Sequence, residues 1–372
     1  MQAVNSRREL KESLQAWSSD AYEDIKDDQR FEEEQTYLKS YLIEADRESL
    51  SEEFTESEDL NIRIHPTDDQ GFLHLEAHGY SNDGPTQLFL DELDERFWVI
   101  HTVGNRDATD AIIEDLIFPR FTQMDRPWLP NEFLEMIGNQ PENTFRRFSL
   151  KFEDEFDGSE DGEIPDVGGL SMQLWGNNAS TVLKTLRENE DLRRSTPLST
   201  VGIKREINGE SVIDDITYYS KFTARGDSVD GHFKQVYDLK NTYSELLHKI
   251  EEEYSIKHRA DERGGFVEGT PLLIAFDREI EDLEEFMDEL FSSKKPFRLW
   301  GVRNQLEQEY YRVSSVDLHT GDKLNLEVCP EWVRIYLPED SCGNVILRLY
   351  TNIQHYFDSE AQLEEVNGGA II

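Results

Sequence analysis

The fold of this chain is decided by residues 199–254, which read STVGIKREINGESVIDDITYYSKFTARGDSVDGHFKQVYDLKNTYSELLHKIEEEY. Residues 199–207 and 216–224 are rich in β-branched and aromatic side chains, and the Asn208-Gly209 pair after the first run is a hairpin signal. From Phe233 to Tyr254 the apolar period becomes that of a helix. The apolar stripe of this helix comprises Phe233, Val236, Tyr237, Tyr243, Leu246, Leu247, Ile250 and Tyr254. Strands followed by a long amphipathic helix predict a helix-covered antiparallel sheet of the α+β type.

The rest of the module at 145–258 has the same make-up. FRRFSLKF and LSMQLWG are predicted strands, and the segment NNASTVLKTLREN is a predicted helix opened by an asparagine cap. The order of elements in this module is therefore β-β-α-β-β-α, which again indicates a sheet covered by helices.

Toward the N-terminus, residues 1–59 are predicted as a helical arm that ends in a linker at 52–59. Apolar residues within 5–51 fall at helical spacing. They are Leu10, Leu14, Trp17, Leu38, Tyr41 and Leu42. The module at 60–144 alternates with a period of two, which predicts a four-stranded antiparallel meander followed by a helix from Asp107.

Toward the C-terminus, the polar, glycine-rich residues 259–269 are predicted as a linker. The module at 270–372 begins with the strand PLLIAF and a helix, and it ends with a short helix near 359–366. Between them lie five predicted strands, PFRLWGV, YYRVSSVDL, DKLNLEV, WVRIYLP and VILRLYT. No motif recurs among the modules at a fixed spacing, so the sequence indicates no internal repeat. The predicted fold class is α+β, with an N-terminal helical arm followed by three modules of mostly antiparallel sheet covered by helices.

Acidic residues dominate the charge of the chain. Its 372 residues include 79 Asp and Glu against 38 Lys and Arg, for a net charge of −41. Such composition also occurs in disordered proteins, but 11% aromatic residues and nearly continuous apolar periodicity predict a folded chain. The acids are spread over every segment, and their mutual repulsion is screened within about 3 Å at molar salt. The composition therefore predicts the acidic protein of a halophile, from a haloarchaeon-like archaeal source.

Cysteine usage and hydropathy predict a cytoplasmic location. Cys329 and Cys342 are the only cysteines in the sequence, which indicates a reducing compartment. The sequence has no apolar run of about 18 residues, the length of a transmembrane helix. Residues 1–17 also lack the apolar run of a secretory signal, so we expect no association with a membrane.

Several enzyme classes are disfavoured because their motifs are missing from the sequence. It contains no GxxxxGK[ST] phosphate loop, no GxGxxG after a strand, no GxSxG elbow, no HExxH and no CxxC pair. Adjacent acids such as Asp214-Asp215 resemble a nuclease site, but in a chain with 79 acids such pairs arise by chance.

The first candidate site comprises His74, Glu76 and His78, which lie on one face of a predicted strand at about 7 Å intervals. His65 on the neighbouring strand and His101 two strands on are placed to approach them. Imidazole and carboxylate groups suit a divalent metal such as zinc or ferrous iron. The alternative is that a half-buried sheet simply turns these polar residues toward solvent. No other cofactor is predicted.

The second candidate is an anion site where a glycine-containing loop enters a helix. Backbone N–H groups at a helix N-terminus attract anions, and cations on the same loop strengthen the attraction. The residues are Lys221, Arg225, Gly226, Ser228 and Lys234. The alternative is a loop in which an Asp or Ser side chain caps the helix and the glycines satisfy the turn.

Basic pairs are scattered along the chain, three of them in the module at 145–258. They are Arg146-Arg147, Arg193-Arg194, Lys204-Arg205, Lys257-His258-Arg259 and Lys294-Lys295. Contacts to phosphate weaken steeply as salt rises, so these pairs alone do not establish nucleic acid binding. Trp98, Trp175 and Trp300 are expected in the core rather than on a stacking surface.

Three functions of different classes fit these observations. The leading hypothesis is a non-catalytic interaction or accessory protein that binds a protein partner, or a second copy of itself, through its N-terminal helices. The alternative is a nucleic-acid-associated component of a defence, repair or regulatory complex, centred on the module at 145–258. The third is a metal-dependent hydrolase that uses the face formed by His74, Glu76 and His78.

Overall fold

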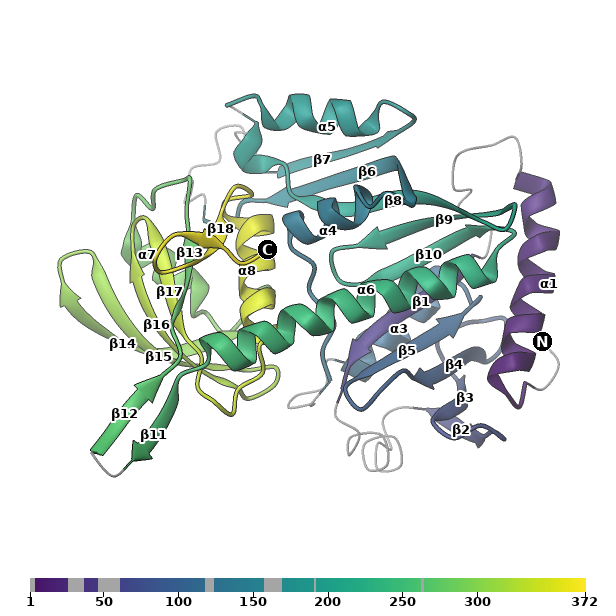
Figure 1. Ribbon diagram of the computed structural model, residues 1–372, viewed down its shortest axis with the longest axis horizontal. Coiled ribbons are helices and arrows are strands. Elements are labelled where there is room, and N and C mark those ends of the chain that lie inside the picture. The colour runs from purple at the N-terminus through teal and green to yellow at the C-terminus, as the bar shows by residue number, and fades with distance from the viewer. Residues whose placement is uncertain are drawn as a thin grey trace.

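The computed structural model describes residues 4–25, 37–45, 61–117, 124–156, 169–190, 192–261 and 264–372. It confirms the α+β class, because helices pack on sheets whose paired strands are all antiparallel (Figure 1). Within these ranges no helix is both long and apolar enough to cross a membrane.

A ten-stranded sheet forms the larger part of the molecule. Its strands lie in the order β2-β3-β4-β5-β1-β10-β9-β8-β6-β7. The strands are β1 (Leu38–Glu44), β2 (Ile62–Pro66), β3 (Phe72–Ala77), β4 (Thr86–Glu92), β5 (Phe97–Thr102), β6 (Asn143–Glu153), β7 (Gly169–Trp175), β8 (Leu198–Ile207), β9 (Glu210–Thr217) and β10 (Lys221–Gly226). The predicted modules at 60–144 and 145–258 therefore share one sheet, joined through β1. The division of the chain into domains stays a prediction.

Helices cover both faces of this sheet. They are α1 (Arg7–Ile25), α3 (Arg106–Ile117), α4 (Asn131–Gly138), α5 (Ala179–Arg187) and α6 (Val229–Lys249). The apolar side of α3 packs against Trp98 and Ile100 on one face. The long helix α6 crosses the other face, where Leu239 and Tyr243 join a core with Leu42.

A seven-stranded sheet, in the order β14-β15-β16-β17-β13-β18-β19, makes up the C-terminal part. Its strands are β13 (Leu272–Ala275), β14 (Leu299–Glu307), β15 (Tyr310–Asp317), β16 (Lys323–Cys329), β17 (Trp332–Tyr336), β18 (Gln362–Glu365) and β19 (Gly369–Ala370). Two helices belong to it, α7 (Leu283–Leu290) and α8 (Asn344–Tyr356). Every residue of α8 from Asn344 to His355 is buried, because this helix lies inside a core that continues from one sheet to the other.

The first and last parts of the chain repeat one topology. β1 to β5 lie in the order β2-β3-β4-β5-β1 and are followed by α3. β13 to β17 lie in the order β14-β15-β16-β17-β13 and are followed by α8. In both units the first strand pairs antiparallel with the fifth. The molecule therefore contains an internal repeat that the sequence did not indicate, because topology is shared without a shared motif.

A chain of buried hydrogen bonds attaches α6 to the ten-stranded sheet. Ser40 Oγ lies 2.6 Å from His101 Nδ1 and 2.6 Å from His232 Nε2, and His232 Nδ1 lies 2.6 Å from Asp214 Oδ1. Burial lowers the pKa of His101 to about 3, so this imidazole stays neutral. The hydrogen bonds run from Ser40 to His232 and on to Asp214, as they do in the catalytic triad of a hydrolase. Ser40 and His232 are 0% exposed, however, so a substrate cannot reach them. We therefore interpret these hydrogen bonds as a clamp that holds α6 on the sheet.

Two predictions about the middle of the ten-stranded sheet were wrong. Leu38–Glu44, predicted as part of the helical arm, is strand β1. All seven of its residues are buried because both faces are covered, so its apolar residues show no alternation and mimic helical spacing. The predicted strand at 216–224 is interrupted by a turn at Ser220, whose φ is 56°, and it divides between β9 and β10.

Two predictions in the C-terminal part were also wrong. VILRLYT was predicted as a strand but lies in α8, since an apolar run that is buried on all sides has no diagnostic period. The short helix predicted near 359–366 is instead β18. The predicted linker at 259–269 carries most of a hairpin, β11 (Lys257–Asp261) and β12 (Gly264–Glu268). Trp98 is buried as expected, whereas Trp175 and Trp300 are 40% and 50% exposed.

The first test concerns the clamp. Replacing His232 with Ala leaves the Asp214 carboxylate and Ser40 without their buried partner, which should lower the free energy of unfolding by about 3 kcal/mol. His248→Ala on the same helix removes an exposed imidazole and should change stability by less than about 0.5 kcal/mol. Denaturant unfolding of both variants measures the difference. Equal losses would show that the clamp contributes nothing specific.

Candidate functional site

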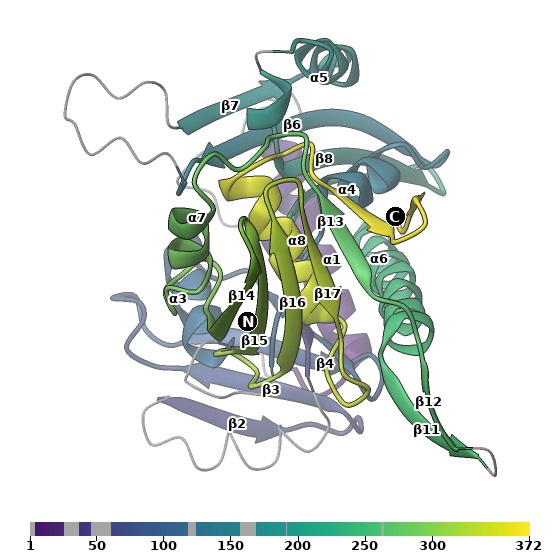
Figure 2. The ribbon, with the colours of Figure 1, turned by 90° about the vertical axis from the view of Figure 1, so that its left-hand side faces the viewer.

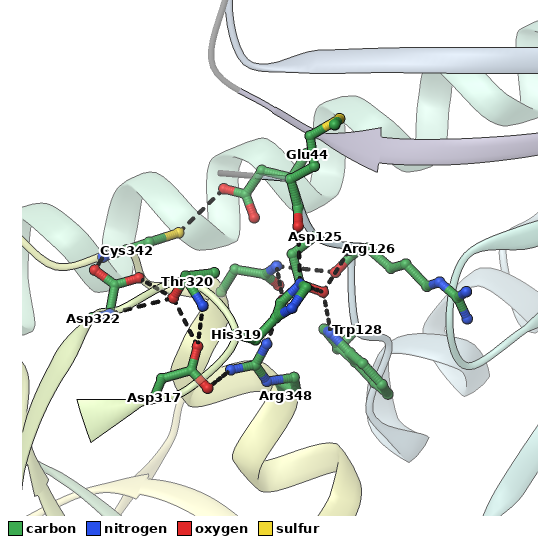
Figure 3. Close-up of polar contacts among 12 residues, drawn as sticks. Glu44, Asp125, Arg126, Trp128, Asp317, His319, Thr320, Asp322, Cys342 and Arg348 are labelled. Carbon is green, nitrogen blue, oxygen red and sulfur yellow. Dashed lines mark hydrogen bonds and ion pairs between the residues drawn. The ribbon is translucent and has the colours of Figure 1, made fainter. Parts of the chain in front are cut away.

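The most elaborate polar cluster lies where the two repeated units meet. Glu44, the last residue of β1, and Asp125 exchange backbone hydrogen bonds of 2.8 and 2.9 Å, which brings the 124–128 segment against the ten-stranded sheet. The C-terminal unit adds the turn between β15 and β16 and the first turns of α8 (Figure 3). We call the resulting cavity the junction pocket.

Arg348 of α8 is the centre of this cluster. Its Nη1 donates to Asp125 Oδ2 at 3.0 Å, and its Nη2 pairs with Asp317 at the end of β15. All three residues are at most 4% exposed. One guanidinium therefore neutralises one carboxylate from each unit, and the remaining oxygen lone pairs accept from Trp128 Nε1 at 3.2 Å and Asn344 Nδ2 at 3.2 Å.

The ion pairs set the protonation of Asp317. Burial on its own would raise the pKa of this carboxyl, but the charge of Arg348 and hydrogen bonds from Thr320 outweigh burial and hold the pKa below its ordinary value. The carboxylates in turn raise the pKa of Arg348 despite its burial. Both groups therefore stay charged.

Thr320 joins Asp317 to a second carboxyl, that of Asp322. Its Oγ1 lies 2.7 Å from Asp317 Oδ2 and 2.6 Å from Asp322 Oδ2. A hydroxyl has one proton to donate, so this proton is shared between the two carboxyl groups. Burial raises the pKa of Asp322 above its ordinary value.

The junction pocket has a volume of about 570 Å³ and a strongly acidic wall. Its carboxyl groups belong to Glu44, Glu95, Asp125, Glu251, Asp322, Glu339 and Asp340. Among the lining residues that the structure describes, Arg96 is the one basic side chain. Its guanidinium is fully engaged, with Glu44 Oε1 at 2.6 Å and both oxygens of Glu251 at 2.6 and 2.7 Å.

Glu44 is left incompletely paired in this wall. Its Oε1 accepts hydrogen bonds from Arg96 and from the Cys342 thiol, the latter at 3.3 Å. Its Oε2 is buried and has no hydrogen-bond partner in the part of the chain that the structure describes. Burial raises the pKa of Glu44, and burial likewise raises the pKa of Cys342, which stays a thiol. A buried acceptor without a donor is costly.

The chemistry of the wall suits an organic cation. Seven carboxyl groups around one arginine, whose guanidinium is fully engaged, attract positive charge. A metal ion needs several ligands that converge, and within the described ranges no group of three or more His, Cys, Asp or Glu residues is arranged to hold one. A guanidinium or ammonium group brings N–H donors of the kind that Glu44 Oε2 lacks.

The predicted metal residues lie at the far edge of the ten-stranded sheet. His65 Nε2 lies 3.0 Å from Glu76 and His78 Nε2 lies 3.4 Å from it, but His74 Nε2 instead contacts Gln87 at 2.5 Å. His101 belongs to the clamp and does not join them. Metal binding by His74, Glu76 and His78 stays a prediction.

The predicted anion residues are distributed over both faces of the sheet. Lys221 reaches Asp110 of α3 at 2.5 Å, and Arg225 lies 4.0 Å from Asp215. At the N-terminus of α6, by contrast, Ser228 accepts from Gly231 N, and Gln15 of α1 accepts from Val229 N. Lys234 pairs with Asp238 on the surface of the helix. The helix start is thus capped from within the chain, and anion binding by Lys221, Arg225, Gly226, Ser228 and Lys234 stays a prediction.

Sequence reasoning missed the junction pocket entirely. One signal was available, since an arginine inside the apolar run VILRLYT needs a buried partner or an exposed face. Its partner Asp125 is 223 residues away, and nothing local connects the two.

Comparison with known proteins identifies relatives over nearly the whole chain. A family model described as MJECL33-like protein matches residues 1–371. A protein of Methanocaldococcus jannaschii described as uncharacterized protein MJECL33 is 30% identical over 400 aligned residues, which cover 97% of this chain and 94% of that protein. No solved structure gives a significant match.

Replacing Arg348 with Met tests the centre of the cluster. The change leaves Asp125 and Asp317 buried without a counter-charge, and we expect a loss of about 3–5 kcal/mol in the free energy of unfolding. Without Arg348, only the hydrogen bonds from Thr320 are left to oppose burial, so the pKa of Asp317 rises and protonation relieves the variant but not the wild type. The gap between the two proteins should therefore shrink as pH falls through about 4. Denaturant unfolding across pH measures it, with the exposed Lys184→Met as control. A gap that stays constant with pH would contradict the assignment.

Proposed function

The chain belongs to the MJECL33-like protein family, and we propose that it is a non-catalytic interaction protein whose junction pocket binds a cationic side chain of a protein partner. The occupant is the guanidinium of an arginine or the ammonium of a lysine. The observation that carries the proposal is the acidic wall of the junction pocket, in which seven carboxyl groups surround one fully paired arginine.

Charge and shape both support this occupant. The wall offers negative charge from both repeated units, so an entering cation contacts each of them. A side chain of arginine or lysine also carries an apolar stem, which fits a pocket whose lining includes Ala45 and Val345. Arginine is the better fit, since its planar fork matches carboxylates in pairs.

The proposed partner surface differs from the one predicted at the N-terminal helices. The apolar residues Leu10 and Leu14 of α1 are buried within the chain itself, at 2% and 0% exposure. Arg7 of the same helix is tied to Asp91 of β4. Because α1 uses its apolar side internally, the junction pocket is the more suitable place for a partner, while contact through the N-terminal helices stays a prediction.

Glu44→Gln tests the pocket directly. The probe is Nα-acetyl-L-arginine amide, with uncharged Nα-acetyl-L-citrulline amide as its neutral counterpart, and binding is measured by isothermal titration calorimetry. We expect wild type to bind the arginine derivative and not the citrulline derivative. E44Q should bind the arginine derivative about tenfold more weakly, a loss of about 1.4 kcal/mol in binding free energy. The exposed Glu210→Gln should leave affinity unchanged.

Two results would overturn the proposal. One is equal affinity of wild type for the charged and neutral probes, or no binding of either. The other is equal affinity of E44Q and E210Q, with both variants shown to be folded by circular dichroism.

We further propose that this protein works in a salt-rich cytoplasm. The proposal is supported by the 79 acids and 38 basic residues of the chain. Their repulsion is felt over about 10 Å at 0.1 M salt but only about 3 Å at 1 M. The midpoint of thermal unfolding should therefore rise with KCl over this range. A protein that is most stable in dilute buffer would contradict the salt-rich setting without touching the binding proposal.

A further inference from the structure

One face of the seven-stranded sheet carries no helix in the part of the chain that the structure describes. Phe286, Met287 and Leu290 of α7 pack into the same core as Val313 and Leu326, and α8 joins that core as well. The other face, which we call the outer face, is turned to the viewer in Figure 2, where α8 lies behind the strands.

Strands β14 to β17 show which side chains form the outer face. Burial alternates along β15, with Tyr311, Val313 and Ser315 buried and the residues between them exposed or half-buried. The strand register extends this alternation to the neighbours. The outward residues are Trp300, Val302, Asn304, Tyr310, Arg312, Ser314, Val316, Lys323, Asn325, Glu327, Trp332, Arg334 and Tyr336.

The outer face is far less acidic than the chain as a whole. Its acidic residues are Glu307, Glu327 and Glu364, of which Glu327 is buried at 3% exposure beneath two arginines. The oxygens of Glu327 accept from Arg312 at 2.8 Å and from Arg334 at 3.1 Å. Lys323 is exposed on the adjoining row of the sheet. Three cations thus balance three carboxylates on this face, in a protein of net charge −41.

Aromatic rings accompany these cations. Trp300 is 50% exposed, although a tryptophan of this kind is expected in the core. The rings of Tyr310 and Trp332 lie 6.1 Å apart, and the guanidinium of Arg334 lies over Trp332 at 4.4 Å from its centroid. The face therefore offers flat surfaces, both aromatic and guanidinium, next to positive charge.

A hollow of about 540 Å³ adjoins these residues beside the β11–β12 hairpin. Arg312, Asn325 and Tyr336 line it from the sheet, and His258 lines it from β11. Glu327, Glu339 and Asp340 also line it. Both oxygens of Glu339 are occupied by Arg259 at 2.7 and 3.1 Å, while Asp340 adds a negative charge.

We propose that the outer face binds single-stranded nucleic acid, with bases stacked on Trp300, Trp332 and Arg334 and phosphates held by Arg312 and Lys323. A four-stranded antiparallel sheet with aromatic side chains on its open face stacks two or three unpaired bases in this manner. Stacking also persists where salt weakens phosphate contacts, which suits a protein with so many acids. This site is separate from the junction pocket and does not depend on it.

The chain supplies a matched pair of tryptophans for the test. Trp300→Ala removes an exposed ring from the outer face, and Trp175→Ala removes a similarly exposed ring, 40% against 50%, from β7 of the other sheet. Neither ring lies in the core, so both variants should fold. Fluorescence anisotropy with labelled 12-residue oligo(dT) and oligo(U) measures binding from about 0.1 M to about 1 M KCl.

We expect Trp300→Ala to weaken binding of the single strands about tenfold and Trp175→Ala to leave it unchanged. Lys323→Gln should reduce the dependence of binding on salt and leave the loss caused by Trp300→Ala in place. No binding by folded wild-type protein at low salt would overturn the proposal. A larger effect of Trp175→Ala would place the site on the middle of the chain instead. Equal competition by poly-glutamate would indicate an acidic peptide partner and would also overturn it.

Discussion

A single buried guanidinium fixes the position of the two sheets of this molecule relative to each other. Arg348 reaches Asp125, which is fixed to the end of β1, and Asp317, which ends β15. Because buried charges are stable only when paired, neither sheet can shift relative to α8 without exposing a carboxylate to an apolar core. The junction pocket exists because of this constraint, since its acidic walls come from both sides of the same contact.

The repeated topology explains why this contact falls where it does. Each unit places its fifth strand beside its first and follows the fifth strand with a helix. In the first unit the helix α3 covers a face of the ten-stranded sheet, whereas in the last unit α8 is buried between the sheets. The same arrangement of elements thus yields a surface helix in one case and a central helix in the other. Arg348 in the central helix therefore pairs with Asp125, which is hydrogen-bonded to the end of β1 in the other sheet.

The local features of the fold were predictable and the long-range ones were not. The Asn208-Gly209 turn is found as expected, with φ of 55° and 89°, and Ile207 pairs with Glu210 across it. The long helix α6 also lies where its apolar stripe places it. Leu38–Glu44 and VILRLYT were misassigned because elements that are buried on all sides lose the periodicity on which prediction depends. The candidate sites depend on pairing between distant segments, as Arg348 with Asp125 or the row of Arg312, Glu327 and Arg334, and no pattern within either segment records that pairing.

The central place of β1 determines when the ten-stranded sheet can close during synthesis. One edge of this strand pairs with β5, while the other waits for β10, where Leu38 meets Ala224. A ribosome delivers about 5–20 residues each second, so a nascent chain spends several seconds with a hydrogen-bonding edge of β1 open. Open strand edges recruit other chains, which makes the interval between these two pairings the period of greatest exposure to aggregation. Late, non-local closure of this kind also slows folding, because the entropy of the intervening loop is lost before the final ladder forms.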